Sequence, residues 1–148
     1  MWSHEYTAIS SLPAAAIWSA LKALHEGRLS YEGADTFVLH GPFAKGTQVS
    51  VTPVGQDTFE STIVDLVENV TYADETAFGD VTLLFRHILV PVEGGTQVTH
   101  RLDISGPSAD EVGPELGLQI SGDFDTSMAS LFEQARLLGQ GGEFAPLD

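Results

Sequence analysis

The first 27 residues contain one alternating segment followed by one helical segment. Residues 2–10 alternate between two faces, a pattern typical of a β-strand. Residues 14–24 then place apolar side chains at helical spacing, and Gly27 stands where such a helix would end. Ser11 has the residue type of an N-cap, with Pro13 in the first helical turn. The pattern therefore predicts a strand that leads into a short helix.

The middle of the chain is dominated by segments rich in β-forming residues. Glu93-Gly94-Gly95 has the composition of a tight hairpin turn, so the segments on either side of it are expected to pair in antiparallel fashion. The segment 58–70 is long enough to contain a bulge that reverses part of its alternation. We expect strands at residues 36–39, 47–54, 58–70, 71–78, 80–91 and 96–105.

The last third of the chain predicts a long amphipathic helix. Ser108 and Glu111 have the spacing of a capping box, which announces a helix start. Because Pro114 follows so soon, we expect a single turn there and then a restart. From Leu116 to Leu138 apolar residues recur at helical spacing, and Gly139 closes the pattern. Residues 140–148 are expected to form a loose tail.

Strands followed by helices, without regular alternation of the two, predict an α+β fold: a curved antiparallel sheet wrapped around a long C-terminal helix. One helix covers only part of such a concave sheet, so an internal cavity is expected between them. The 148 residues contain no repeat or linker, which favours a single domain over residues 1–148 with an ordered core at about 2–139.

Charge and composition narrow the range of partners. Six Lys and Arg against 21 Asp and Glu give a formal net charge of −15, which disfavours nucleic acids and anionic membrane surfaces. The absence of cysteine excludes disulfides and thiolate chemistry. The N-terminus lacks the features of a signal peptide, and no apolar run is long enough to insert into a bilayer. We therefore expect a cytoplasmic protein, either a monomer or a homodimer.

Three segments resemble the START/polyketide-cyclase superfamily, also called SRPBCC, whose fold is the helix-grip. They are the opening of the first helix at Leu12-Pro13-Ala14-Ala15-Ala16-Ile17-Trp18, the segment 41–47, and the turn Gly94-Gly95-Thr96 that enters the last strand. The likeness extends from about Ser3 to Leu138. These motifs concern fold geometry, so the resemblance implies the helix-grip fold and a ligand cavity without assigning catalytic residues. The family includes lipid and sterol carriers, hormone binders and aromatic polyketide cyclases.

The candidate polar residues of the cavity are His87 and His100. Each shares a strand face with apolar neighbours, and a turn near Glu93-Gly94 would place them opposite each other. Two imidazoles in an apolar cavity can orient a hydroxyl or carbonyl group, or transfer a proton as acid and base. The alternative for each is a core histidine that is hydrogen-bonded to a backbone or hydroxyl partner.

Metal and cofactor binding are not expected. His4 lies on the strand that the family pairs with the last strand, and three histidines would suggest zinc. No closely spaced ligand pair supports a metal site, however, and no nucleotide, hydrolase or zincin motif occurs.

The remaining candidates come from the strand 71–78, from the face that carries His87, and from the helix. Asp74 shares a face with two aromatic residues, but we expect it to be an exposed strand-end carboxylate. Arg86 and Arg101 have the opposite parity to their histidine neighbours and are expected on the solvated face, which favours a neutral ligand. The other predicted ligand-binding residues are Tyr72, Phe78, Phe85, Ile120 and Phe124.

Three functions fit these features. The first is binding of a small, largely apolar ligand, either lipid or polyketide-like, in the internal cavity, without a cofactor. The second is a cyclase or dehydratase that uses His87 and His100 as acid and base. The third is a protein-interaction module that works through the acidic surface.

Overall fold

The computed structural model describes residues 1–139. It consists of seven strands and three helices within that range. Their bounds are β1 (Trp2–Ser10), α1 (Ala14–His25), β2 (Thr36–Leu39), β3 (Gln48–Thr52), β4 (Phe59–Val67), β5 (Thr71–Phe78), β6 (Val81–Val92), β7 (Gly95–Ser105), α2 (Ala109–Ser121) and α3 (Phe124–Gly139). The tail predicted at 140–148 lies outside the described residues.

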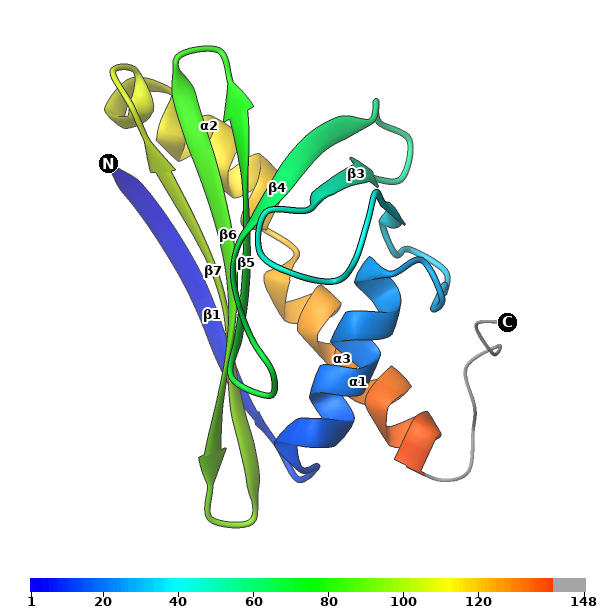
Figure 1. The fold of residues 1–148 in the computed structure, drawn as a ribbon. Helices are drawn as coiled ribbons and strands as arrows, with labels where there is room; N and C mark the ends of the chain where they lie inside the picture. Colours follow the sequence, from blue (N-terminus) through cyan, green and yellow to red (C-terminus); the bar gives the residue numbers. More distant parts are fainter. Residues whose placement is uncertain (140–148) are drawn as a thin grey trace.

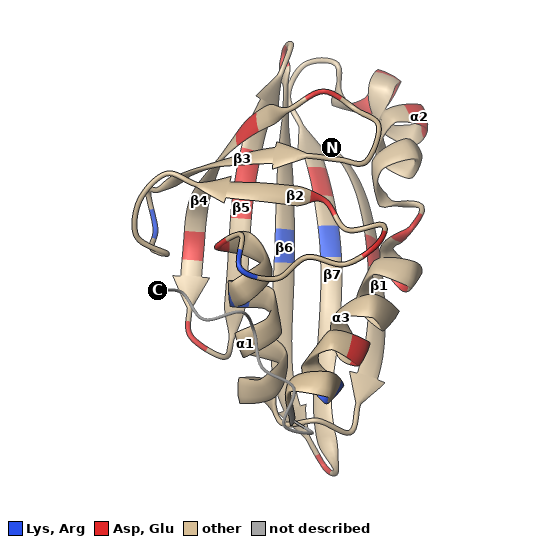
Figure 2. Cartoon of the chain, turned by 90° about the vertical axis from the view of Figure 1, so that its right-hand side faces the viewer, with Lys and Arg blue, Asp and Glu red and all other residues tan. Residues whose placement is uncertain are grey.

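The strands form one sheet in the order β1-β7-β6-β5-β4-β3-β2, and every neighbouring pair is antiparallel. The sheet curves so that β3 and β4 reach out over α1, while α1, α2 and α3 all lie on one side of it (Figure 1). The view in Figure 2, turned by 90°, shows the helices in front of the strands. This confirms the predicted α+β architecture, a curved antiparallel sheet against a C-terminal helix.

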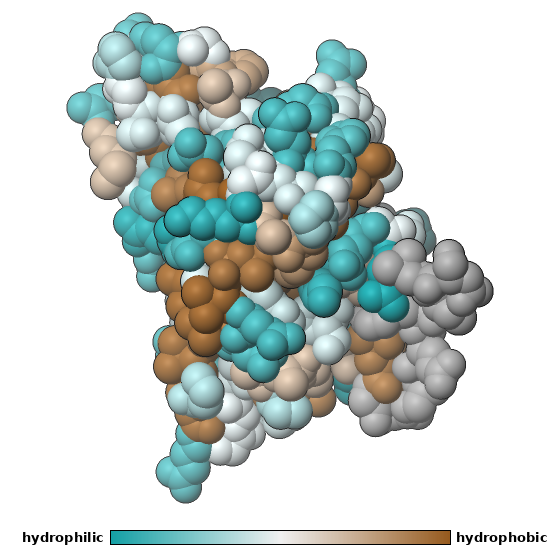
Figure 3. All heavy atoms as spheres, viewed as in Figure 1, coloured by the Kyte–Doolittle hydropathy of each residue, from teal (hydrophilic) through white to brown (hydrophobic). Residues whose placement is uncertain are grey.

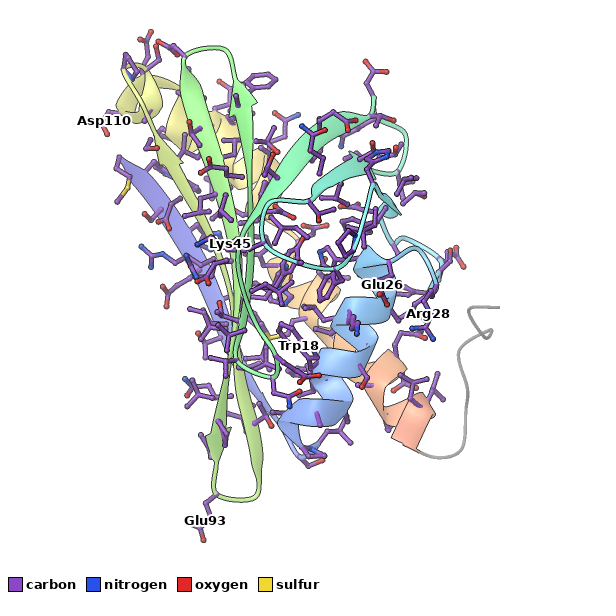
Figure 4. The ribbon with its side chains drawn as sticks, viewed as in Figure 1. Trp18, Glu26, Arg28, Lys45, Glu93 and Asp110 are labelled. Carbon is purple, nitrogen blue, oxygen red and sulfur yellow. The ribbon has the colours of Figure 1, made fainter. Side chains whose placement is uncertain are left out.

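Two buried apolar clusters hold the helices on the concave face of the sheet. The larger cluster joins α1 and α3 to the sheet, and includes Ile17, Leu21 and Met128, each at most 1% exposed. In Figure 4 Trp18 points from α1 toward the sheet, whereas Glu26 and Arg28 lie at the end of α1 away from it. The second cluster joins α2 to β6 and β7 and comprises Val81, Leu83, Leu102, Ile104 and Ala109.

The C-terminal helix is interrupted at a different place from the one the sequence predicted. Pro114 lies inside α2, and the interruption falls at Gly122 and Asp123, between α2 and α3. The expected break at Pro114 was therefore wrong. Because Pro114 stands only six residues into α2, its missing N–H removes one bond near a helix start. Gly122, which has low helix propensity, instead accommodates the change of direction.

The predicted serine caps were also wrong in detail. Pro13, not Ser11, occupies the N-cap position of α1, and its carbonyl accepts the first helical bonds from Ala16 and Ile17. Ser108 does occupy the N-cap position of α2, but its hydroxyl donates to the Asp80 carboxylate at 2.6 Å. A charged acceptor makes the stronger hydrogen bond, so the hydroxyl does not cap the helix.

Glycines in α2 allow the first strand to approach that helix closely. A Cβ atom built on Gly113 would lie 2.5 Å from Trp2 Cβ, and one on Gly117 would lie 2.2 Å from Trp2 Cζ3. The indole of Trp2 therefore packs directly against the helix backbone. This contact holds α2 against β1 and places the C-terminal end of α2 beside His4.

The long fourth strand contains the expected irregularity. The register between β4 and β5 shifts between Ile63 and Asp65, which is the bulge predicted for this segment. Ile63 is fully buried, while Asp65 pairs with Arg86 on the convex side. Because of the bulge, Ile63 and Asp65 face opposite sides of the sheet although they are two residues apart.

Candidate functional site

His87 and His100 lie directly opposite each other on β6 and β7, as the hairpin alternation predicted. Their ring centroids are 4.4 Å apart and the rings are nearly perpendicular, at 88°. Tyr72 on β5 is the cross-strand partner of His87, so the three side chains form one row across the concave face. The neighbouring row contains Asp74, Phe85 and Leu102.

A third histidine, which the sequence analysis did not single out, completes this cluster. His25 ends α1, is 3% exposed, and places its ring 4.3 Å from that of Tyr72 and 5.8 Å from that of His87. Its Nδ1 donates to the Leu21 carbonyl at 2.8 Å, since a carbonyl can only accept. The signal was available in its spacing, because His25 follows Ile17 and Leu21 by eight and four residues on the buried face.

Asp74 is buried, and the expectation of an exposed carboxylate was wrong. It is 5% exposed, and the Tyr72 hydroxyl donates to its Oδ2 at 2.7 Å. Burial raises the pKa of Asp74 above its ordinary range, while His25 and the hydrogen bond from Tyr72 act in the opposite direction. Burial also raises the pKa of Tyr72. The acid is retained inside because tertiary packing supplies a donor that strand parity alone does not reveal.

The three clustered histidines are neutral at pH 7. Burial, together with the neighbouring His25, lowers the pKa of His100 to about 4. Burial and the neighbouring His100 and His25 hold the pKa of His87 well below its ordinary value. Burial likewise lowers the pKa of His25, although Asp74 opposes this shift. Each neutral imidazole therefore offers one N–H donor and one nitrogen acceptor.

Three buried polar atoms on this face have no hydrogen-bond partner among the described residues. They are His87 Nδ1, His100 Nε2 and Thr76 Oγ1. Buried polar atoms in folded proteins are nearly always paired, and each exception calls for an explanation. The alternative interpretation, that both histidines are satisfied by backbone or hydroxyl groups, does not hold for these two nitrogens.

The predicted apolar residues Phe85, Ile120 and Phe124 are half-buried and pack against the second apolar cluster. The Phe124 ring lies 5.9 Å from the His100 ring and is stacked on that of His4, also at 5.9 Å. On the other side, Phe43 stacks on Tyr72 with centroids 5.6 Å apart. The histidine row is thus bordered by aromatic side chains that are not fully covered.

Two predicted ligand-binding residues occupy other environments. Phe78 is 60% exposed at the end of β5, opposite Val81, and is not brought into the histidine row. Its parity is that of Tyr72, but its side chain is left exposed at the end of the strand. Tyr72 is central to the row, yet it has no exposed surface and its hydroxyl is committed to Asp74. It supports the site from within the core.

The convex face of the same strands carries the cations. Arg86 pairs with Asp65 at 2.7 Å, and Arg101 pairs with Glu5 and Asp103, as expected for outward-facing residues. In Figure 2 acidic positions are spread over strands, helices and loops, whereas basic positions are few. Figure 3, viewed as in Figure 1, shows hydrophobic residues between hydrophilic ones on the side of the molecule that it presents, so that side is mixed in polarity.

His4 does not join the other histidines in a metal site. Its Nδ1 lies 2.8 Å from Ser121 Oγ, which donates its own proton to the Gly117 carbonyl, so His4 Nδ1 is the donor. Within residues 1–139, no three His, Cys, Asp or Glu side chains form a group suited to a metal ion. In the same range no helix has the length and apolarity to cross a membrane.

A separate groove lies at the junction of β1 and α1 with α3. Its volume is about 340 Å³. It is lined by Ser10, Ser11, Leu12, Ala129, Phe132, Glu133 and Arg136. None of the predicted ligand-binding residues borders it, so it is not the cavity that the sequence analysis expected.

Known proteins share this architecture at low sequence identity. No protein-family model matches the chain, and no curated protein matches its sequence. Among solved structures, an aromatase/cyclase from a Streptomyces species superposes with a TM-score of 0.70 and 15% identity, covering 91% of this chain and 93% of that one. Norcoclaurine synthase from Thalictrum flavum gives 0.67 and 14%, covering 93% and 86%. Ara h 8.0201 gives 0.60 and 17%, covering 90% and 93%.

These likenesses establish the fold. The chain has the helix-grip fold of START/polyketide-cyclase-like proteins, as the sequence resemblance implied. The likeness holds over nine-tenths of the chain or more in all three comparisons.

Proposed function

We propose that this protein binds a small, largely apolar molecule between the concave face of its sheet and its C-terminal helices. The observation that carries the proposal is the pair of buried ring nitrogens without partners, His87 Nδ1 and His100 Nε2. A bound hydroxyl or carbonyl group would supply the missing hydrogen bonds.

The surroundings of the two histidines suit an apolar ligand body. Phe85, Ile120 and Phe124 are half-buried and pack against the second apolar cluster, and the Phe124 ring lies 5.9 Å from that of His100. Covering about 250 Å² of apolar ligand surface there would contribute roughly 6 kcal/mol before the costs of association. The norcoclaurine synthase structure contains dopamine and hydroxybenzaldehyde, so the shared fold accommodates small aromatic molecules in at least that protein.

A second candidate function is acid–base catalysis of the cyclase or dehydratase type. The raised pKa of Asp74 favours its protonated form. Tyr72, which hydrogen-bonds to this acid, has its ring 4.3 Å from that of His25 and 5.8 Å from that of His87. Against it, the lowered pKa values make His87 and His100 weak bases at neutral pH. In the enzyme hypothesis His87→Ala abolishes turnover and leaves binding largely intact.

The test is a thermal-shift panel of sterols, fatty acids, flavonoids and aromatic polyketides. A ligand at 100 times its Kd adds roughly 2.7 kcal/mol to the unfolding free energy. For a chain of this length the midpoint rises by roughly 5–10 °C. No rise with any class, on protein first stripped of co-purified lipid, would contradict the proposal and leave the acidic surface as the better hypothesis.

The variant His100→Leu separates a ligand-binding histidine from a structural one. Removing an unpaired buried nitrogen leaves the stability of the free protein unchanged or raises it. In our proposal the same variant lowers the ligand-induced shift. If His100 were only structural, the substitution would instead destabilise the protein and leave ligand binding unchanged. His40→Leu is the matched control, because His40 is 46% exposed and hydrogen-bonds to Ser50 outside the site.

A further inference from the structure

Resting on the proposed function, we infer that the site selects ligands whose polar head is uncharged, a hydroxyl or a carbonyl, and excludes carboxylates. This inference names the chemical class of the ligand head. It follows from three observations: the positions of the cations, the burial of an acid, and the hydrogen-bonding groups that the histidines present to a ligand.

The arginines of residues 1–139 are each paired with an acid, and none of these acids belongs to the histidine row. Arg28 pairs with Glu26, Arg86 with Asp65, Arg101 with Glu5 and Asp103, and Arg136 with Glu133. Lys45 contributes to the electrostatic environment of Asp65 on the convex side. Lys22 Nζ lies 5.9 Å from the centroid of Phe43, whose ring stacks on that of Tyr72.

The interior contains an acid in place of a cation. Asp74 is 5% exposed and lies opposite Phe85, in the row that neighbours the histidine row. A ligand carboxylate beside it would lose its hydration, gain no opposite charge, and meet a second acidic group. If Asp74 ionises, the two anions also repel each other at low effective dielectric.

The histidines cannot replace the missing cation near neutral pH. Their lowered pKa values keep them uncharged, so they contribute one donor and one acceptor each. A hydroxyl group also has one donor and spare lone pairs, and can bridge His87 Nδ1 and His100 Nε2. A carbonyl or carboxylate oxygen can accept only from a ring nitrogen that carries the proton, and a neutral ring gives the carboxylate no opposite charge to offset its lost hydration.

The experiment compares three naphthalene probes of similar shape at pH 7: 2-naphthol, 2-naphthoate and (2-naphthyl)methylammonium. Titration calorimetry on the full chain gives their affinities. We expect 2-naphthol to bind at least tenfold more tightly than 2-naphthoate. We expect Asp74→Asn to narrow that ratio several-fold by improving naphthoate binding, since the asparagine Oδ1 still accepts from the Tyr72 hydroxyl.

The control variant is Glu60→Gln, which removes one negative charge from a side chain 56% exposed on the outer face of β4. It should leave the ratio between the two probes unchanged. Circular dichroism and the unfolding midpoint establish that each variant is folded before its affinities are compared.

The possible outcomes distinguish failure of this inference from failure of the proposed function. Equal binding of naphthol and naphthoate, or preferred binding of the ammonium probe, would overturn the inference and leave the proposed function in place. Naphthoate binding that is lost in Lys22→Met would also overturn it, by identifying a cation that receives the carboxylate. Failure of all three probes, together with every class in the thermal-shift panel, would overturn the proposed function itself.

Discussion

On β6 and β7, the arginines of the convex face have partners, whereas some polar atoms on the concave face have none among the described residues. Arg86 and Arg101 on the convex face are paired with acids, whereas His87 and His100, one position away, each leave a buried nitrogen without a described partner. Pairing on the outer face is easily achieved, because water and long side chains can adapt. Unpaired nitrogens on the inner face carry a cost that a purely structural core would avoid. The difference supports our proposal that the inner face is the one that binds a ligand.

The largest effect is expected from truncating the centre of the inner face. Tyr72→Ala should destabilise the protein by about 3–5 kcal/mol, since it removes a fully buried aromatic ring and the hydrogen-bond donor of Asp74. Urea unfolding measures the change. A loss below about 1 kcal/mol would mean that the inner row is not the packed support described here.

The inner face should also make stability depend on pH. The folded-state pKa of His100 is about 4, below the ordinary histidine value of 6.5, so the unfolded chain binds more protons between these values. Stability is complete above about pH 6.5 and falls as the pH decreases toward 4. His100 alone should cost about 2 kcal/mol at pH 5 relative to pH 7.

Comparison with His100→Gln isolates this contribution. Asp74 acts in the opposite direction, because its raised pKa gives stability at low pH that is lost as the pH rises. The variant keeps Asp74 and His25, so the difference between its pH dependence and that of the parent protein belongs to His100. Identical unfolding free-energy profiles for the two proteins would contradict burial of a neutral imidazole at this position.

The smallest effect is expected on the outer face. Arg101→Met breaks partly exposed pairs with Glu5 and Asp103 and should change the unfolding free energy by about 0–1 kcal/mol. The change should shrink further in high salt. A loss as large as that of Tyr72→Ala, measured by the same urea titration, would remove the distinction between the two faces.

Local patterns were sufficient for part of the site. The His87–His100 register followed from strand alternation and a turn at Glu93-Gly94, because pairing in a tight hairpin is determined by residues close in sequence. The strand order needed the family resemblance. Parity also placed Arg86 and Arg101 correctly on the outer face.

The parts that the sequence missed depend on contacts between distant segments. His25 joins the site only because α1 docks against β5 and β6. Asp74 is buried beside Tyr72, whose hydroxyl donates to it, whereas Phe78 on the same face is 60% exposed. The interruption of the C-terminal helix falls at Gly122 and not at Pro114, since the packing of α2 on Trp2 continues the helix past the proline.

The central claim, that the inner row of histidines contacts a ligand, can be tested most directly by nitrogen NMR of the imidazole rings. Adding 2-naphthol to protein labelled with nitrogen-15 in histidine should shift His87 Nδ1 and His100 Nε2 and leave His40 unchanged. Binding that shifts neither ring, or that shifts only resonances around the groove between β1 and α3, would contradict the account.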